Sequence, residues 1–203
     1  MKNRLVYWVG MHGTLLFFRK FLRHGTKIAG IVPSSTHLAR AAITGIRSDA
    51  KVILELGAGT GPITAAIVGR VQSTCRIIAI ERDADFVRVL KKRFVTQANL
   101  EIVQADISGL RQILKDRGVE RVRHVVSGLP IPSFSQELQK TLFRDIHEIL
   151  AFDGSFNQIT EIPLLYRNLY RRYFEEVEFI FELRNIPPAG VYICKRPRLD
   201  LSA

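Results

Sequence analysis

The chain has 203 residues, of which 47% are hydrophobic and 24% are charged, and this mixture excludes a disordered protein. The length fits one domain with a sizeable core. The formal net charge of +11 indicates an anionic partner, which could be nucleic acid, anionic lipid or an acidic protein. Cys75 and Cys194 lie in apolar surroundings without metal-ligand spacing, so we expect reduced, buried thiols of a cytoplasmic protein.

Residues 1–33 are basic and apolar, and the chain has no acidic residue before Asp49. On a helical projection, one side carries Leu15, Phe17, Phe18, Phe21 and Leu22, and the other carries Arg19, Lys20, Arg23 and Lys27, with Leu16 as the exception. This pattern predicts a basic amphipathic helix, which either covers the domain core or lies in the headgroup zone of an anionic membrane. We expect neither a secretion signal nor a transmembrane segment, because the apolar run at 5–18 is interrupted and shorter than the ~20 residues of a spanning helix.

From residue 34 onward, segments typical of strands and helices alternate. Strands are predicted at 51–56, 75–80, 100–106, 124–129 and 155–160, and helices at 36–46, 63–71, 84–94, 110–116, 136–150 and 164–174. This order predicts an α/β fold in which helices cover both faces of a mostly parallel sheet. Two final strands, at 177–183 and 190–196, are joined by a link too short for a crossover, so we expect them to pair antiparallel. We expect residues 34–203 to form one domain.

The first predicted strand runs into a glycine-rich turn, ELGAGTG, at 55–61. Such a turn lets a ligand approach the backbone and directs helix amides toward it, although it could also be purely structural. A nucleoside triphosphate loop would need a lysine that is absent, and a dinucleotide loop has its third glycine one residue later. The spacing E-x-G-x-G-x-G resembles the first motif of the seven-stranded, Rossmann-like S-adenosylmethionine-dependent methyltransferases. In that family the acidic residue works with the methionine end of the cofactor, and the glycines make room for it.

Acidic residues also follow the next two strands. Glu81 stands at the distance from the glycine turn at which a carboxylate binds the ribose hydroxyls in nucleoside-binding βαβ units. In the methyltransferase pattern an aspartate after the third strand meets the adenine amino group, and the resemblance gives this role to Asp106. Because ligands of parallel sheets bind beyond the carboxyl ends of the strands, the ordered set indicates S-adenosylmethionine as cofactor and S-adenosylhomocysteine as product.

The turn after the fourth strand reads SGLPIPSF, at 127–134. Amino-methylating enzymes that act on nucleic-acid bases often carry [N/D]-P-P-[Y/F] here, and this chain lacks both the Asn or Asp and the aromatic residue. A proline-stiffened turn is the structural alternative. The segments FLRHGTKIAGIVPSS, ELGAGTG, AIERD, VVSGLPI, SFNQIT and RNIPPAGVYICKR occur in the same order in bacterial phospholipid N-methyltransferases, which nearly the whole chain resembles.

This resemblance implies a cytoplasmic enzyme, peripheral to the inner membrane, that methylates phosphatidylethanolamine and its mono- and dimethyl forms toward phosphatidylcholine. It also implies that the VPSS segment closes over the cofactor, although Ser34 or Ser35 could equally cap the following helix. The candidate cofactor-binding residues are Ser34, Ser35, Glu55, Gly57, Ala58, Gly59, Gly61, Glu81, Arg82, Asp106, Ile107 and Ser127.

The implied reaction is attack of an amine lone pair on the sulfonium methyl carbon. Backbone carbonyls at Gly128 and Leu129 could orient the amine, and Glu161, a tyrosine of the segment 166–173 or water could accept its proton. The family tends to have an aromatic residue where this chain has Glu161, which leaves the headgroup preference open. The segment 166–173 is either a second lipid-binding cluster or an ordinary helix face. The candidate lipid-binding residues are Phe18, Arg19, Lys20, Phe21, Arg23, Tyr166, Arg167 and Tyr173.

Two rival functions share the cofactor motifs. An rRNA adenine N6-dimethyltransferase would explain the basic charge, but the sequence lacks its acceptor motif and its added C-terminal helical domain. A non-catalytic membrane-binding protein with a cofactor pocket is the other rival. We therefore expect an anionic membrane surface and a phospholipid substrate as partners, no nucleic acid, no metal and a monomeric state.

Overall fold

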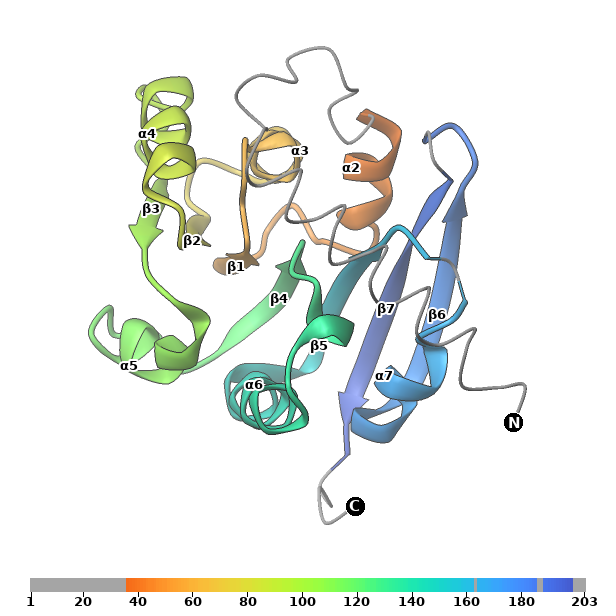
Figure 1. The fold of residues 1–203 in the computed structure, drawn as a ribbon. Helices are drawn as coiled ribbons and strands as arrows, with labels where there is room; N and C mark the ends of the chain where they lie inside the picture. Colours follow the sequence, from red (N-terminus) through yellow and green to blue (C-terminus); the bar gives the residue numbers. More distant parts are fainter. Residues whose placement is uncertain (1–35, 163, 186–187, 199–203) are drawn as a thin grey trace, which may run out of the picture.

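The computed structural model describes residues 36–162, 164–185 and 188–198 (Figure 1). Within them, seven strands form one sheet in the order β3-β2-β1-β4-β5-β7-β6. The strands are β1 (Val52–Leu56), β2 (Arg76–Glu81), β3 (Leu100–Gln104), β4 (Val122–Ser127), β5 (Leu150–Thr160), β6 (Phe174–Glu182) and β7 (Ala189–Pro197). The helices are α2 (Thr36–Ala42), α3 (Pro62–Arg70), α4 (Ala84–Arg93), α5 (Leu110–Lys115), α6 (Gln136–Ile149) and α7 (Arg167–Tyr173), with short 3-10 turns η1 (Ile107–Gly109) and η2 (Ile131–Ser133). The helix expected in residues 1–33 lies outside the described residues, as do Ser34 and Ser35.

Strands β1 to β5 pair in parallel, and β7 runs antiparallel to both of its neighbours, β5 and β6. The link between β6 and β7 is too short to return the chain to the other end of the sheet, so the two strands form a hairpin. The predicted fold class, a Rossmann-like sheet with an antiparallel last strand, is confirmed.

Helices cover both faces of the sheet (Figure 1). On one face α5, α6 and α7 pack against Leu54 and Leu56 of β1. On the other face α2 and α3 pack against Ile53, and α4 packs against Ala79 of β2. A central parallel strand that is buried on both faces reads as an unbroken apolar run, and Glu55 is the one exception within β1.

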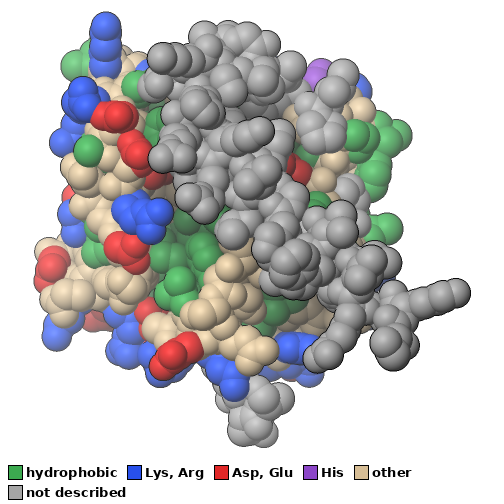
Figure 2. All heavy atoms as spheres, viewed as in Figure 1, with side chains coloured by type: hydrophobic (Ala, Val, Ile, Leu, Met, Phe, Trp, Pro, Cys, Tyr) green, Lys and Arg blue, Asp and Glu red, His purple; other side chains and the backbone are tan. Residues whose placement is uncertain are grey.

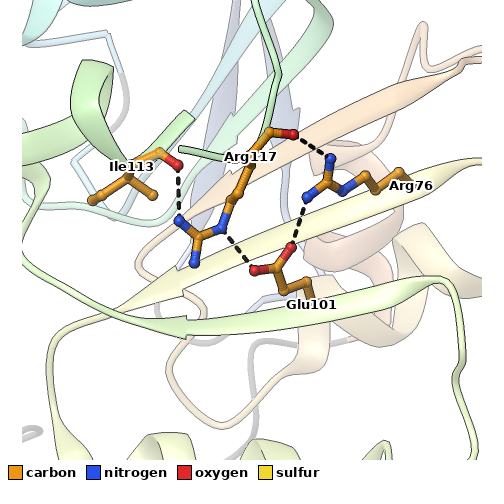
Figure 3. A network of polar contacts seen from close by, with 4 residues as sticks. All are labelled: Arg76, Glu101, Ile113 and Arg117. Atoms are coloured by element: carbon orange, nitrogen blue, oxygen red, sulfur yellow. Dashed lines mark hydrogen bonds and ion pairs between the residues drawn. The ribbon is translucent and has the colours of Figure 1, made fainter. Parts of the chain in front are cut away.

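A network of polar contacts lies at the amino end of the sheet, where β2 and β3 begin. The carboxylate of Glu101 binds two guanidinium groups, that of Arg76 at 3.0 Å and that of Arg117 at 2.7 Å (Figure 3). Burial by itself raises the pKa of Glu101, but the hydrogen bonds from both arginines outweigh burial, so the pKa lies below its usual value. Arg117 follows α5 in the chain, so the network joins this helix to the sheet far from the strand ends at which ligands bind.

Several element boundaries differ from those expected from the sequence. β3 ends at Gln104, and Asp106 lies in the following turn, where its carboxylate accepts a hydrogen bond from the Ser108 amide at 2.9 Å. α7 begins at Arg167 instead of residue 164, because Leu164 has a left-handed backbone with φ of 64°. The predicted helix at 36–46 ends at Ala42, before a turn at residues 43–45.

Candidate active site at the strand ends

The carboxyl ends of the central strands meet at one edge of the sheet. Leu56 pairs with Ile80 on one side and with Ser127 on the other, and Glu81 pairs with Gln104. The strand order reverses at β1, since β2 and β3 follow it on one side and β4 and β5 on the other. Open α/β sheets bind ligands at such a switch point, beyond the carboxyl ends of the strands.

The glycine turn between β1 and α3 combines close packing with open space. Gly57 and Gly59 have φ of 74° and 55°, in the left-handed region that glycine tolerates. A Cβ atom on Gly57 would lie 2.8 Å from Cδ2 of Leu129, whereas a Cβ atom on Gly59 would meet no described atom within 4 Å. Gly61 precedes α3, whose first residue Pro62 needs no hydrogen-bond acceptor. The turn therefore packs on Leu129 at Gly57 and leaves room for a ligand at Gly59.

The backbone amides of the turn are mostly bonded within the protein. The amides of Gly57 and Ala58 both donate to the Ile80 carbonyl, at 2.9 and 3.3 Å, and the Gly61 amide donates to the Ala58 carbonyl at 2.9 Å. The Thr60 amide has no acceptor among the described residues, and it is therefore a donor available to a ligand. Sequence reasoning missed Thr60, because the motif shows where glycines stand but not which amides are already bonded.

Glu81 connects the glycine turn after β1 to the turn between β2 and α4. One carboxylate oxygen accepts a hydrogen bond from the Gly59 amide at 2.9 Å, and the other accepts from the Asp83 amide at 2.8 Å. The side chain is fixed between the glycine turn and the start of α4. Each carboxylate oxygen still has a free lone pair, so Glu81 can also accept hydrogen bonds from ribose hydroxyls.

Glu55 is fully buried, and neither carboxylate oxygen has a hydrogen-bond partner among the described residues. Burial raises its pKa to about 7; Thr64 of α3 lies close enough to counteract part of this rise, and Glu81 adds to it. An unpartnered carboxylate next to the glycine turn favours a positively charged group, such as the ammonium group of the methionine part of S-adenosylmethionine. The residues present therefore fit this cofactor.

Asp106 and Arg82 form the outer rim of the site. The hydrogen bond from the Ser108 amide lowers the pKa of Asp106, and Arg82, whose Nη1 lies 3.6 Å from Oδ2, lowers it further. Both side chains are exposed and Ile107 is half-buried, so all three remain accessible to an adenine ring. Their contact with the cofactor remains a prediction.

The turn after β4 leaves only one of the two predicted carbonyl groups available. The Leu129 carbonyl accepts hydrogen bonds from the Ile131 amide at 2.9 Å and from the side-chain amide of Gln158 at 2.8 Å. The Gly128 carbonyl receives no donor from the described residues. Ser127 is fully buried, and its hydroxyl accepts from the Leu129 amide at 3.2 Å, so in the structure it shapes the turn. This arrangement favours Gly128 over Leu129 as the group that orients an acceptor amine.

Glu161 directly follows β5, beside the end of β4. The Thr160 hydroxyl accepts a hydrogen bond from the Ile162 amide at 3.1 Å and donates to the Ile162 carbonyl at 3.2 Å, which fixes the turn around Glu161. Glu161 is exposed at the surface, and nearby protein atoms still desolvate the carboxylate enough to raise its pKa. A raised pKa makes a carboxylate a better proton acceptor.

The tyrosines near α7 do not suit the role of proton acceptor. Burial raises the pKa of Tyr166, Tyr170, Tyr173 and Tyr192, so all four stay protonated at neutral pH. Tyr173 also stacks on Phe143, with ring centroids 4.0 Å apart, and immediately precedes β6, at the amino end of the sheet (Figure 1). The structure therefore separates Tyr173 from the strand ends.

The fold and the donor groups at the strand ends define a Rossmann-like methyltransferase that uses S-adenosylmethionine. The family described as "Methyltransferase domain" matches residues 53–154. The chain belongs to this family, and S-adenosylmethionine is its methyl donor.

Curated relatives extend the match beyond the cofactor half. The chain is 52% identical over 186 residues to an ornithine lipid N-methyltransferase of Singulisphaera acidiphila, which covers 91% of this chain and 97% of that protein. It is also 37% identical over 93 residues to a probable ribosomal RNA small subunit methyltransferase A of Methanosarcina barkeri, where the match covers 46% of this chain and 29% of that protein.

Solved structures share the fold at low sequence identity. A S-adenosylmethionine-dependent O-methyltransferase of Thermotoga maritima has a TM-score of 0.62 and 13% identity, covering 87% of this chain and 71% of that chain. Aeropyrum pernix fibrillarin, solved with natively bound S-adenosylmethionine, has a TM-score of 0.55 and 17% identity, covering 77% and 73%. These likenesses show the fold alone.

Proposed function

We propose that this enzyme methylates the primary amine of a lipid headgroup, and in the first place that of an ornithine lipid. The observation that carries the proposal is the 52% identity to an ornithine lipid N-methyltransferase, which extends over 97% of that protein. The match thus includes the strands on the acceptor side of the sheet. By contrast, the match to the Methanosarcina barkeri RNA methyltransferase covers only 46% of this chain and 29% of that protein.

The chemistry needs alignment more than activation, because S-adenosylmethionine supplies an already activated methyl group on a positively charged sulfur. The amine lone pair forms the new N–C bond, the C–S bond breaks, and its electron pair stays on sulfur. The Gly128 carbonyl accepts a hydrogen bond from the amine and so directs the nitrogen lone pair toward the methyl group. Glu161 takes the proton that the nitrogen must lose, since its pKa is raised and the tyrosine hydroxyls stay protonated.

Phosphatidylethanolamine, the acceptor that the sequence resemblance implied, presents a primary amine of the same kind and is the second lipid to test. An acidic side chain, Glu161, replaces the aromatic residue that the phospholipid-methylating family tends to have at this place. The ornithine lipid comes first because of the 52% identity to an ornithine lipid N-methyltransferase.

We also propose that the enzyme works at the surface of an anionic membrane, as a peripheral protein. The net charge of +11 favours such a surface, each nearby cation contributing ~1 kcal/mol. On the face in Figure 2, Lys and Arg side chains are spread over α4 and the lower margin with acidic residues among them. The proposed contacts Phe18, Arg19, Lys20, Phe21 and Arg23 lie outside the described residues, and Tyr166 and Arg167 lie at the start of α7. None of the described helices is both long and apolar enough to cross a bilayer.

The test is methyl transfer from labelled S-adenosylmethionine to defined vesicles. The purified full chain is incubated separately with anionic vesicles that contain ornithine lipid, with vesicles that contain phosphatidylethanolamine, with amine-free vesicles and with RNA. We expect label in the ornithine lipid. Label only in phosphatidylethanolamine would show that this lipid, and not the ornithine lipid, is the substrate. Label only in RNA would favour the rRNA methyltransferase. Vesicle binding without transfer to any acceptor would favour the non-catalytic membrane-binding protein.

A further inference from the structure

Gln158 connects β5 to the turn after β4 and has no role in the mechanism described so far. The side chain is only 1% exposed, and the residue pairs with Ser127 of β4 and with Tyr192 of β7. Its amide nitrogen donates one hydrogen bond to the Leu129 carbonyl at 2.8 Å and another to the Ile159 carbonyl at 2.7 Å. Two carbonyl acceptors fix the orientation of the amide, because only its nitrogen can donate to both.

The hydrogen bonds from Gln158 add to others that hold the turn after β4 in place. The Leu129 amide is bonded to the Ser127 hydroxyl, and the Pro130 carbonyl accepts hydrogen bonds from both the amide and the hydroxyl of Ser133. Gln158 fills the remaining lone pair of the Leu129 carbonyl. Among the described residues, no donor is bonded to the Gly128 carbonyl, so this acceptor stays available.

The fixed turn also touches the glycine turn directly. A Cβ atom on Gly128 would lie 3.0 Å from the Gly57 carbonyl oxygen, and a Cβ atom on Gly57 would lie 2.8 Å from Cδ2 of Leu129. At Gly128 the two backbones therefore pack directly against each other, and at Gly57 the Leu129 side chain packs against the glycine turn. A displacement of Leu129 would change the distance between the acceptor side and the cofactor side of the site.

The amide of Gln158 is incompletely bonded. Its carbonyl oxygen is buried and has no hydrogen-bond partner among the described residues, and the same holds for the neighbouring Asn157. Such a group costs stability that an apolar side chain of similar size would not. The amide nitrogen, however, binds the Leu129 carbonyl and so connects β5 to the turn after β4.

We propose that Gln158 is a positioning residue for methyl transfer, which holds the Leu129 carbonyl and thereby sets the Gly128 carbonyl at the correct place relative to the cofactor turn. The assignment rests on the proposed function, in which Gly128 orients the acceptor amine. In-line transfer is sensitive to such placement, and a shift of ~1 Å can lower the rate by ~100-fold.

The neighbouring residue supplies a matched control. Asn157 is also a buried amide of β5, but its nitrogen donates to the carbonyls of Ala42 and Thr44, at 2.9 and 3.0 Å, at the end of α2. We expect Gln158→Leu to lower kcat by ~30- to 100-fold while the Kd for S-adenosylmethionine in calorimetry changes less than ~3-fold. We expect Asn157→Leu to lower the melting temperature with kcat within ~3-fold of the parent. Wild-type kcat in Gln158→Leu, or an equal loss of kcat in Asn157→Leu, would overturn the proposal.

A second variant keeps the test decisive if Gln158→Leu does not fold. In Gln158→Glu the carboxyl group can donate to the Leu129 carbonyl only when protonated, so its activity relative to the parent should rise as the pH is lowered. A ratio that does not change with pH contradicts the positioning role.

Hydrogen exchange separates this inference from the proposed function. If the wild-type enzyme methylates no lipid amine, the proposed function fails, yet the amide of Ile131, which shares the Leu129 carbonyl with Gln158, still reports on the turn. Gln158→Leu or Gln158→Glu should accelerate its exchange severalfold, and Asn157→Leu should not. Unchanged exchange in the Gln158 variants would overturn the positioning role by itself.

Discussion

Replacing Glu55 by glutamine should make the cofactor-free protein more stable at alkaline pH and weaken cofactor binding at the same time. Glu55 is fully buried, its carboxylate has no hydrogen-bond partner among the residues that the structure describes, and burial raises its pKa from 4.5 to about 7. Between these two values the folded state holds a proton that the unfolded state has lost, so the contribution of Glu55 to stability is best at low pH and falls as the pH rises. At ~1.36 kcal/mol per pKa unit, ionised Glu55 destabilises the fold by about 3 kcal/mol at pH 8.

Glutamine has nearly the same shape as a protonated glutamate and does not ionise. In urea unfolding without cofactor, Glu55→Gln should match the parent at about pH 4.5 and exceed its stability by about 3 kcal/mol at pH 8. Its Kd for S-adenosylmethionine should rise about tenfold at pH 8, because a hydrogen bond to a charged group is lost. Glu120→Gln, which changes an exposed carboxylate, is the control and should alter neither quantity.

The reasoning would be refuted by a stability difference between Glu55→Gln and the parent that does not depend on pH. It would also be refuted if the variant bound S-adenosylmethionine as tightly as the parent at pH 8, since Glu55 would then not face the cofactor's ammonium group.

Further predictions concern the cofactor turn, acid stability and the far end of the sheet. Gly59→Ala should lose ~1–2 kcal/mol of stability and more than tenfold in cofactor affinity. The control Gly45→Ala, with φ of 79° and no described atom near its Cβ, should lose only the stability. Equal cofactor affinities of the two variants in calorimetry would contradict the prediction. Burial lowers the pKa of His124 to about 4, so its neutral form supports the fold above pH 6.5, and about 3 kcal/mol of stability is lost on acidification to pH 4. In urea unfolding, the stability of His124→Gln should therefore fall less with acid than that of the parent. An unchanged pH dependence of stability would contradict this prediction. Glu101→Gln should cost ~1 kcal/mol, because the ion pairs to its two arginines are partly exposed, and leave kcat unchanged; a lower kcat would place the network in the catalytic machinery.

Much of the fold follows from local sequence patterns. The alternation of apolar runs with amphipathic segments predicts the parallel sheet, because each strand that is covered on both faces must be apolar throughout. The short link after residue 183 predicts the antiparallel last strand. Boundaries were less predictable: the positive φ of Leu164, which delays the start of α7, has no mark in the sequence.

The candidate site, like the fold, is visible in the sequence only in part. Glycine spacing and the acidic residues Glu55, Glu81 and Asp106 are visible in the sequence because a motif is a local property, and parallel strands bring their ends to one edge. Which groups remain free depends on contacts between residues far apart in the chain. The Leu129 carbonyl is occupied by Gln158, 29 residues away, and the carboxylate of Glu55 finds no hydrogen-bond partner within the described part of the chain. Only the tertiary structure decides such questions, since hydrogen-bonding capacity is used up by neighbours in space.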